Sequence, residues 1–317
     1  MPRILEPGQI EAYAQRAVPR IRLPGADGPF AARARRLRQL ALPGAPGYAI
    51  AEYLELTAAI AEAQARALAD LPAAPTAAEE IARARTHHMP VLHATGVARP
   101  AVWRELALAI SATAAGSPAA SSAVREIDRR LRELRLEDLE AQADALLAAR
   151  TAEIDVATAP FLMAALQVQW AALARSLQAT DVAPLEVPGV CPACGTLPVA
   201  SVVRANAESQ GYRYLHCALC ATEWHMVRVT CTQCQNNENL GYHSIEGSSG
   251  AIRAESCDRC HTYRKILYQE KDADVEPVAD DLASLALDLL MAEAGYQRGS
   301  GNPLLWQQSR SSAPSSD

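Results

Sequence analysis

The residues best suited to chemistry in this 317-residue chain are its eight cysteines, which all lie between positions 191 and 260. They form four C-x-x-C pairs with none left over: Cys191/Cys194, Cys217/Cys220, Cys231/Cys234 and Cys257/Cys260. Two sulfurs three residues apart on a tight turn can face one ion, and two such turns complete a tetrahedron with bonds of about 2.3 Å. The cysteines therefore predict two four-sulfur sites and two metal ions per chain.

An internal repeat predicts which pairs share an ion. The first four cysteines map onto the last four with a constant offset of 40 positions, which Arg213/Arg253 and Thr222/Thr262 also keep. A duplication of this kind makes the first four cysteines one site and the last four the other. The alternative joins the two outer pairs and the two inner pairs, as in the cysteine-rich region of DnaJ-type chaperones. That region has a glycine after each pair, whereas here only Cys194 is followed by one, Gly195.

Other cysteine chemistry fits the pattern less well. Glu6 and Glu11 stand where a signal peptide needs an apolar run, so we expect a reducing compartment, which favours metal over disulfides. Thioredoxin-type exchange needs a C-x-x-C that opens a helix after a strand. Tetrahedral sulfur suits either zinc or a single rubredoxin-type iron. The stretch 191–195, CPACG, resembles a rubredoxin knuckle and slightly favours iron at that site.

Histidines are the remaining candidate ligands. Four lie in the cysteine-rich stretch: His216, His225, His243 and His261. Because each site already has four thiolates, we expect them beside the ions or on strand surfaces, rather than as ligands or proton donors. A second cluster, His87, His88 and His93, has no acidic partner at a recognisable spacing, and we assign it no role.

The charge balance argues against nucleic acid and against a membrane. The chain has 36 acidic and 30 basic residues, and residues 186–270 contain seven basic and eight acidic ones. Two divalent ions held by eight thiolates bring that stretch to about −5, whereas phosphate binding needs uncompensated cations. Two stretches without charge, 106–124 and 156–174, are long enough to span a membrane, but both contain proline and several polar residues. We expect buried helices there, and no membrane span.

The elements that position the cysteines begin with a helical region. Residues 1–185 are rich in Ala, Leu, Arg and Glu and contain no cysteine, which predicts an all-α domain of six or seven helices. We expect helix starts at Asp27 with Pro29, at Thr76 with Glu79 and at Ser117 with Pro118. Two apolar stripes at helical spacing predict core faces: Leu162, Leu166, Trp170, Leu173 and Leu177, and Ile127, Leu131 and Leu134.

The chain then changes to short β-type runs. Residues 181–190 contain two prolines and read as a linker, and the runs at 197–204, 223–230 and 263–269 predict strands. We expect a multidomain α+β fold. Two tandem rubredoxin-like or zinc-ribbon units, residues 186–226 and 227–272, follow the helical domain. Residues 273–306 are predicted to form a C-terminal helix and docking segment. The helix is opened by Asp280 and Asp281 and ends near Gly295. One side of it is apolar and contains Leu282, Leu285, Leu289 and Leu290. A polar tail occupies 307–317.

The cysteine-rich stretch and the segment after it resemble the FdhE family of formate dehydrogenase accessory proteins. The resemblance covers residues 191–306 and rests on CPACGTLPVASVV (191–203), RYLHCALCATEWHMVRVTC (213–231), AESCDRCHTYRKILYQEKD (254–272) and ADDLASLALDLLMAEAGYQRGSGNP (279–303). It implies a cytoplasmic protein that assists the maturation of formate dehydrogenase, contacts the catalytic subunit and carries rubredoxin-like metal. The family's metal ligands map onto all eight cysteines, and 222–225 and Asp280-Asp281 match its pattern.

The functional prediction is a non-enzymatic maturation factor that binds formate dehydrogenase through its two-metal module. The sequence has no phosphate loop, nucleophile elbow or paired catalytic carboxylates at a readable spacing. A fully sulfur-ligated ion also has no open position for water. The alternatives are a rubredoxin-like electron carrier for the same enzyme and, third, a nucleic-acid-binding zinc ribbon. The sequence does not decide between iron and zinc or between a homo-oligomer and a monomer. It also leaves open the partner-binding surface and the role of His225.

Overall fold

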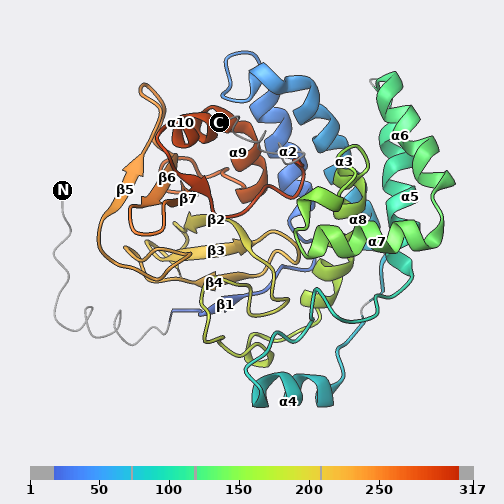
Figure 1. Cartoon of the computed structure of the whole chain (residues 1–317), viewed down its shortest axis with the longest axis horizontal. Helices are drawn as coiled ribbons and strands as arrows, with labels where there is room; N and C mark the ends of the chain where they lie inside the picture. Colours follow the sequence, from blue (N-terminus) through green and yellow to red (C-terminus); the bar gives the residue numbers. More distant parts are fainter. Residues whose placement is uncertain (1–17, 73, 118–119, 208, 307–317) are drawn as a thin grey trace, which may run out of the picture.

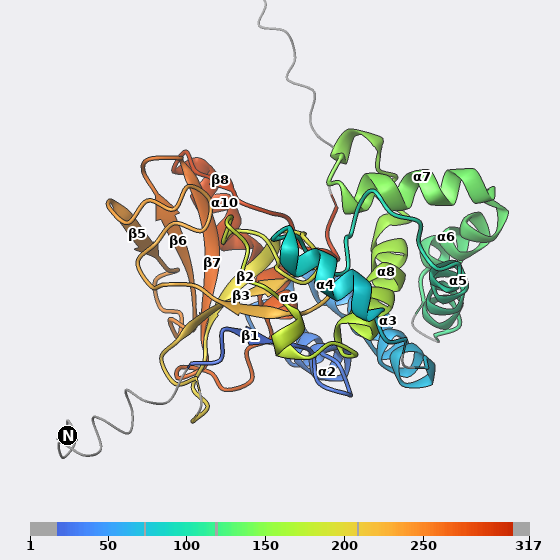
Figure 2. The same ribbon diagram turned by 90° about the horizontal axis from the view of Figure 1, so that it is seen from below.

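A helical half and a sheet half lie side by side in the computed structural model, which describes residues 18–306 except 73, 118–119 and 208 (Figures 1 and 2). Seven α-helices precede the main strands in the described residues: α2 (Phe30–Ala41), α3 (Ala51–Asp70), α4 (Ala78–Thr86), α5 (Val102–Ala115), α6 (Ser122–Glu133), α7 (Leu136–Leu147) and α8 (Ala159–Ala174). The predicted helical region is confirmed. None of the helices in the described part is long and apolar enough to cross a membrane.

Helix α8 is the centre of the helical half. Every one of its residues except Leu173 is buried, which confirms the predicted buried helix. Leu162, Leu166 and Trp170 of the predicted stripe are core, and burial extends to the other faces as well. Helices α3, α5 and α7 surround it, and its many alanines let their backbones approach closely. Its buried Gln167 accepts a hydrogen bond from Gln64 Nε2 at 2.9 Å and donates from Nε2 to the carbonyl of Ala218 at 2.7 Å. The second bond joins α8 directly to a cysteine turn.

The helix starts differ from the predicted ones. Helix α2 begins after Pro29 without a side-chain cap, and α4 begins after Ala77, so neither Asp27 nor Thr76 caps a helix. Helix α6 is capped by the Ser121 hydroxyl, which accepts from the Val124 amide at 3.3 Å, whereas Ser117 stands too early and Pro118 lies outside the described residues. Of these three helices, only α6 starts at a side-chain cap, and that cap is Ser121.

The repeat appears in the structure as two three-stranded antiparallel units. The first contains β2 (Pro198–Val203), β3 (Arg213–Cys217) and β4 (Glu223–His225), and the second β5 (Leu240–His243), β6 (Ile252–Cys257) and β7 (Thr262–Tyr268). Tyr214 pairs with His225 in one unit, and the residues 40 positions later, Ala254 and Lys265, pair in the other. Strand β4 ends at His225, earlier than predicted.

One continuous sheet results because the two units pair edge to edge. Strand β2 runs parallel to β7, giving the order β1-β4-β3-β2-β7-β6-β5, and β8 (Gln297–Arg298) pairs with β7 off this path. The short strand β1 (Ile21–Arg22), which precedes all the helices of the described residues, adds to the outer edge of β4. A segment from the start of the chain therefore closes the edge of the first cysteine unit.

The C-terminal segment is two short helices rather than one. Helix α9 (Pro277–Ala283) is capped by the Glu276 carboxylate, which accepts from the amides of Val278 and Ala279, so the prediction that Asp280 and Asp281 open the helix is wrong. The chain turns at Ser284 before α10 (Leu285–Glu293). Because of that turn, the predicted apolar side is not continuous: Leu282 is buried, whereas Leu289 is 67% exposed.

Asp280 and Asp281 are fully buried, each in its own ion network. Asp280 pairs with Arg36 of α2 at 2.7 Å, and Asp281 contacts Arg298 and lies 3.5 Å from Lys265 Nζ. Lys265 is itself buried and also pairs with Asp288 at 2.7 Å. These networks join α9 and α10 both to the sheet and to α2.

Candidate metal centres

The eight cysteines gather into two groups of four. In the first group, the Sγ atoms of Cys191 and Cys220 lie 3.6 Å apart and those of Cys194 and Cys217 lie 3.4 Å apart. The grouping predicted from the repeat is confirmed, and the DnaJ-like pairing is wrong. Sulfurs held about 2.3 Å from one ion in a tetrahedron are about 3.8 Å apart, close to the distances found. All eight thiols are free, at separations far beyond the length of a disulfide bond.

The second group has the same geometry. The Sγ atoms of Cys231 and Cys260 are 3.6 Å apart, and those of Cys234 and Cys257 are 3.7 Å apart. Within each group every sulfur lies within 4.8 Å of the others, and no histidine or carboxylate of the described residues joins either group. Each is therefore a closed all-sulfur set, large enough for one tetrahedral ion.

Backbone amides point at one sulfur in each of the two groups. The amides of Leu219 and Cys220 point at Cys217 Sγ, at 3.4 and 3.3 Å, and those of Gln233 and Cys234 point at Cys231 Sγ, at 3.4 and 3.5 Å. Such donors stabilise a thiolate because they meet its negative charge. The two turns share this pattern because both are tight C-x-x-C turns, although the repeat maps Cys191 onto Cys231 and Cys217 onto Cys257 and so does not make them equivalent.

The residue after each C-x-x-C pair has a left-handed backbone. Its φ is +81° at Gly195, +60° at Ala221, +60° at Gln235 and +52° at His261. Only Gly195 adopts this region without steric cost, so the other three turns hold an L-residue in a strained conformation. The absence of a glycine after a pair therefore does not indicate a different turn, and a sequence signal based on glycine misses three of the four.

Burial makes the first group a poor place for bare thiolates. Burial raises the pKa of the Cys191 thiol far above its ordinary value, and the same cause raises that of Cys220. Burial by itself would also raise the pKa of Cys217, but hydrogen bonds from the neighbouring thiols outweigh it and lower that pKa. Four adjacent buried sulfurs ionise together only beside a cation. The donor set therefore fits a divalent zinc or iron ion.

The histidines of the sheet half lie outside both sulfur groups. His216 is buried, with Nδ1 3.1 Å from Glu223 Oε1, and burial together with the charges of Arg33 and Arg204 lowers its pKa to about 3, so the ring is neutral. His225 packs edge-on against Tyr214, with ring centres 5.9 Å apart. His243 contacts Ser256 Oγ at 2.8 Å. These rings support strands and turns, as the sequence predicted.

The loop that contains His87, His88 and His93 has a role that the sequence did not reveal. It lies against the first cysteine turn: the Leu92 amide donates to the Ala193 carbonyl at 2.8 Å, and the Ala94 amide donates to the Cys194 carbonyl at 3.0 Å. It is the backbone of this loop, not its histidine side chains, that meets the site. Backbone contacts of this kind leave no residue-type signal in a sequence.

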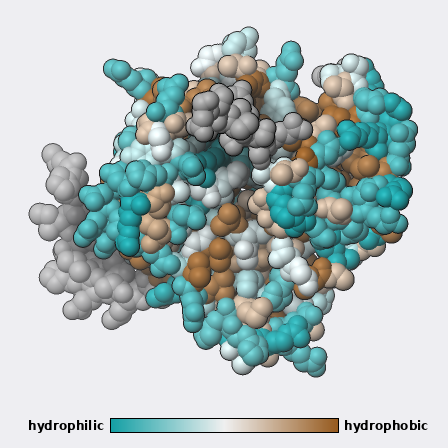
Figure 3. Space-filling model, in the orientation of Figure 1, coloured by the Kyte–Doolittle hydropathy of each residue, from teal (hydrophilic) through white to brown (hydrophobic). Residues whose placement is uncertain are grey.

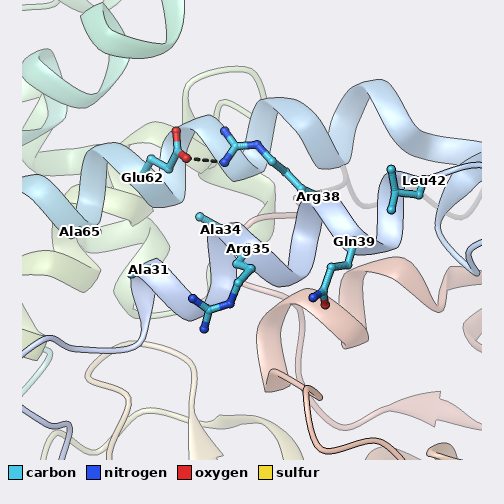
Figure 4. A pocket seen from close by; sticks show the side chains of 8 residues that line it. All are labelled: Ala31, Ala34, Arg35, Arg38, Gln39, Leu42, Glu62 and Ala65. Carbon is cyan, nitrogen blue, oxygen red and sulfur yellow. Dashed lines mark hydrogen bonds and ion pairs between the residues drawn. The ribbon is translucent and has the colours of Figure 1, made fainter.

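A groove between two helices offers no comparable chemistry. The groove in Figure 4, about 420 Å³, lies between α2 and α3 and contains an Arg38–Glu62 ion pair among alanines, without a nucleophile or paired acids. Figure 3 shows a largely hydrophilic face on which apolar residues form only small, scattered groups. The cysteine groups are therefore the strongest candidate functional site in the described part of the chain.

Comparison with known proteins gives one consistent result. Residues 18–186, 190–228 and 229–305 match the FdhE N-terminal, central and C-terminal domains. A protein FdhE homolog of Edwardsiella ictaluri is 43% identical over 90% of each chain, and protein FdhE of Escherichia coli K12 is 39% identical over 95% of this chain and 96% of its own. The crystal structure of the FdhE protein from Pseudomonas aeruginosa superposes with a TM-score of 0.77, at 38% identity, covering 90% of this chain and 98% of that one. The chain belongs to the FdhE family.

Proposed function

We propose that this protein is an accessory factor that assists the maturation of formate dehydrogenase and binds its catalytic subunit through the two-metal cysteine module. The observation that carries the proposal is the pair of closed four-cysteine groups in a chain of the FdhE family. A site that is saturated with thiolates has no coordination position for water or substrate, so it suits folding and recognition rather than hydrolysis. We infer no enzymatic activity, no nucleic-acid partner and a cytoplasmic location, where thiols stay reduced.

The eight cysteines would hold one ion in each group. Such an ion supplies positive charge to four thiolates and ties two turns together, and iron would add one-electron chemistry. The protein's own contribution is the set of amides aimed at Cys217 and Cys231, which stabilises the thiolate form at each site.

The test is capture of the catalytic subunit by anaerobically purified protein. Cys191→Ala should lower the metal content and abolish capture together, because the first group joins the sheet to the helical half. Arg135→Ala, on the exposed surface of the helical half, is the matched control and should retain both. Capture by a metal-free Cys191→Ala protein at the level of the unaltered chain would overturn the proposal.

A second candidate function is electron transfer to or from the same enzyme. It is favoured by the partial exposure of Cys234 and Cys260 in the second group, since an exposed ligand brings an ion close to a partner's surface. Elemental analysis and visible spectra decide it. A red, reversibly reducible protein with about two irons per chain, as expected for two sulfur-ligated iron sites, would support electron transfer, and a colourless zinc protein would exclude it.

A further inference from the structure

The two four-cysteine groups have the same internal geometry but different surroundings. In the first group all four cysteines are at most 1% exposed. In the second, Cys231 and Cys257 are buried, whereas Cys234 and Cys260 are partly exposed. The exposed pair occupies the positions that Cys194 and Cys220 occupy in the first unit, 40 residues earlier. The repeat therefore places equivalent sulfurs in two different environments.

The helical half covers the first group. The loop at 92–94 donates two backbone hydrogen bonds to the first turn, and Gln167 of α8 donates to the Ala218 carbonyl in the other. Cys191, Cys194, Cys217 and Cys220 belong to the same apolar core as the buried residues of α5 and α8. Reaching these sulfurs requires part of that core to open.

The second group has less cover: the Gln297 amide donates to the His261 carbonyl at 2.8 Å beside its second turn, but Cys234 and Cys260 stay partly exposed. Around its exposed edge lie polar side chains: Gln233, Asp258 and Arg259 are exposed, and the Tyr296 hydroxyl donates to Asp258 Oδ1 at 2.7 Å. The adjacent apolar cluster is small: its buried residues are Ala254, Tyr263, Leu287 and Met291, with Ile252 and Tyr296 packed against them. No cysteine of the second group belongs to it, and Cys234 and Cys260 stay partly exposed.

The residues between the paired cysteines encode this difference. The first site has Pro192-Ala193 and Ala218-Leu219 inside its two turns, and the second has Thr232-Gln233 and Asp258-Arg259. Apolar residues at these positions pack under a cover, whereas charged and amide side chains stay in water. The duplicated units have therefore diverged in sequence at the positions that control access to each sulfur group.

We propose that the two groups hold their ions with different permanence: the first is a closed structural site that joins the helices to the sheet, and the second is an open site that releases and takes up its ion through the edge formed by Cys234 and Cys260. The inference rests on metal binding as proposed above and assigns the exchangeable ion to one of the two sites. The first ion leaves only after the cover opens, whereas the second is reached by a solute directly.

The experiment uses the full chain loaded with two zinc ions, and it measures zinc release to the chromogenic chelator 4-(2-pyridylazo)resorcinol. We expect two phases of one zinc each, separated at least about tenfold in rate, since a cover that costs about 1.4 kcal/mol to open gives that factor. Parallel alkylation with N-ethylmaleimide, followed by peptide mass spectrometry, should label Cys234 and Cys260 before Cys194 and Cys220. A single phase, or earlier labelling of the first group, would overturn the inference.

The matched variants are Cys260→Ser and Cys220→Ser, at equivalent positions of the repeat. Cys260→Ser should bind about one zinc, lose the fast phase and keep the helical half folded, because the first site is intact. If Cys220→Ser fails to fold, the kinetics of the unaltered chain still decide the question. No formate dehydrogenase subunit is present in this experiment, so failed capture would overturn the proposed function alone, and equal release rates would overturn the asymmetry alone.

Discussion

Replacing Lys265 with methionine tests whether the buried ion network holds the C-terminal helices on the sheet. Its ammonium group donates to the carbonyls of Asp281 and Ser284, at 2.8 and 3.1 Å, and to Asp288 Oδ2 at 2.7 Å. Methionine retains the apolar stem and leaves little cavity, so the loss is chiefly electrostatic. The carboxylates of Asp281 and Asp288 are then left with Arg298 as their charged partner. Removing one partner of a buried pair costs about 3–5 kcal/mol.

Urea unfolding of the metal-loaded chain, followed by tryptophan fluorescence, measures this loss. The chain has one other lysine, Lys271, which is exposed, and Lys271→Met should change the free energy of unfolding by no more than about 0.5 kcal/mol. Adding Asp281→Asn to Lys265→Met removes the uncompensated charge and should recover more than about 1 kcal/mol. A loss below about 1 kcal/mol for Lys265→Met, the size typical of surface pairs, would refute the reasoning.

Three further outcomes are expected. Burial raises the pKa of Asp281, but the charges of Lys265 and Arg298 outweigh it and hold the pKa below 3.8. Its stabilisation is therefore present above about pH 4 and lost as the pH falls through the folded value, and Asp281→Asn should flatten the decline of Tm between about pH 5 and pH 3. Gln235→Gly relieves a left-handed residue and should raise the free energy of unfolding by about 0.5–1 kcal/mol in urea melts, whereas a decrease would argue against strain in that turn. Trp224→Phe removes the 2.7 Å bond from Nε1 to the Pro188 carbonyl, and calorimetry should show a loss of about 1 kcal/mol; no change in Tm would count against this bond.

The cysteine pattern could be predicted from the sequence because the turn geometry is local and repeats. An offset of 40 positions fixed the grouping of the sulfurs, and the structure has the same strand register at 214/225 and 254/265. Two sulfurs three residues apart must lie close in any tight turn, whatever the rest of the chain does. The sequence alone therefore predicts the position of each group of four cysteines. That these cysteines bind metal stays a prediction.

The features that the sequence did not reveal depend on contacts between distant segments. The stripe predicted for α8 is core, but burial extends to nearly all of the helix because three other helices surround it. Asp280 and Asp281 look like helix-starting residues, but their partners, Arg36 and Lys265, come from other elements. The parallel pairing of β2 with β7 and the addition of β1 to β4 leave no periodic signal. Local propensity cannot specify such pairings because they depend on which distant segments the fold brings together.

The parallel joint between β2 and β7 has a consequence for assembly. The edge strands are β2 and β4 in the first unit and β5 and β7 in the second. Because β2 pairs with β7, the outer edges of the two joined units are those of β4 and β5. In the repeat, β5 is equivalent to β2 and β4 to β7. The β5 of a second chain would therefore pair with β4 as β2 pairs with β7, and such a head-to-tail contact does not close on itself. Ile21 and Arg22 occupy that place as β1. This two-residue strand thus covers the part of the β4 edge where such pairing would begin.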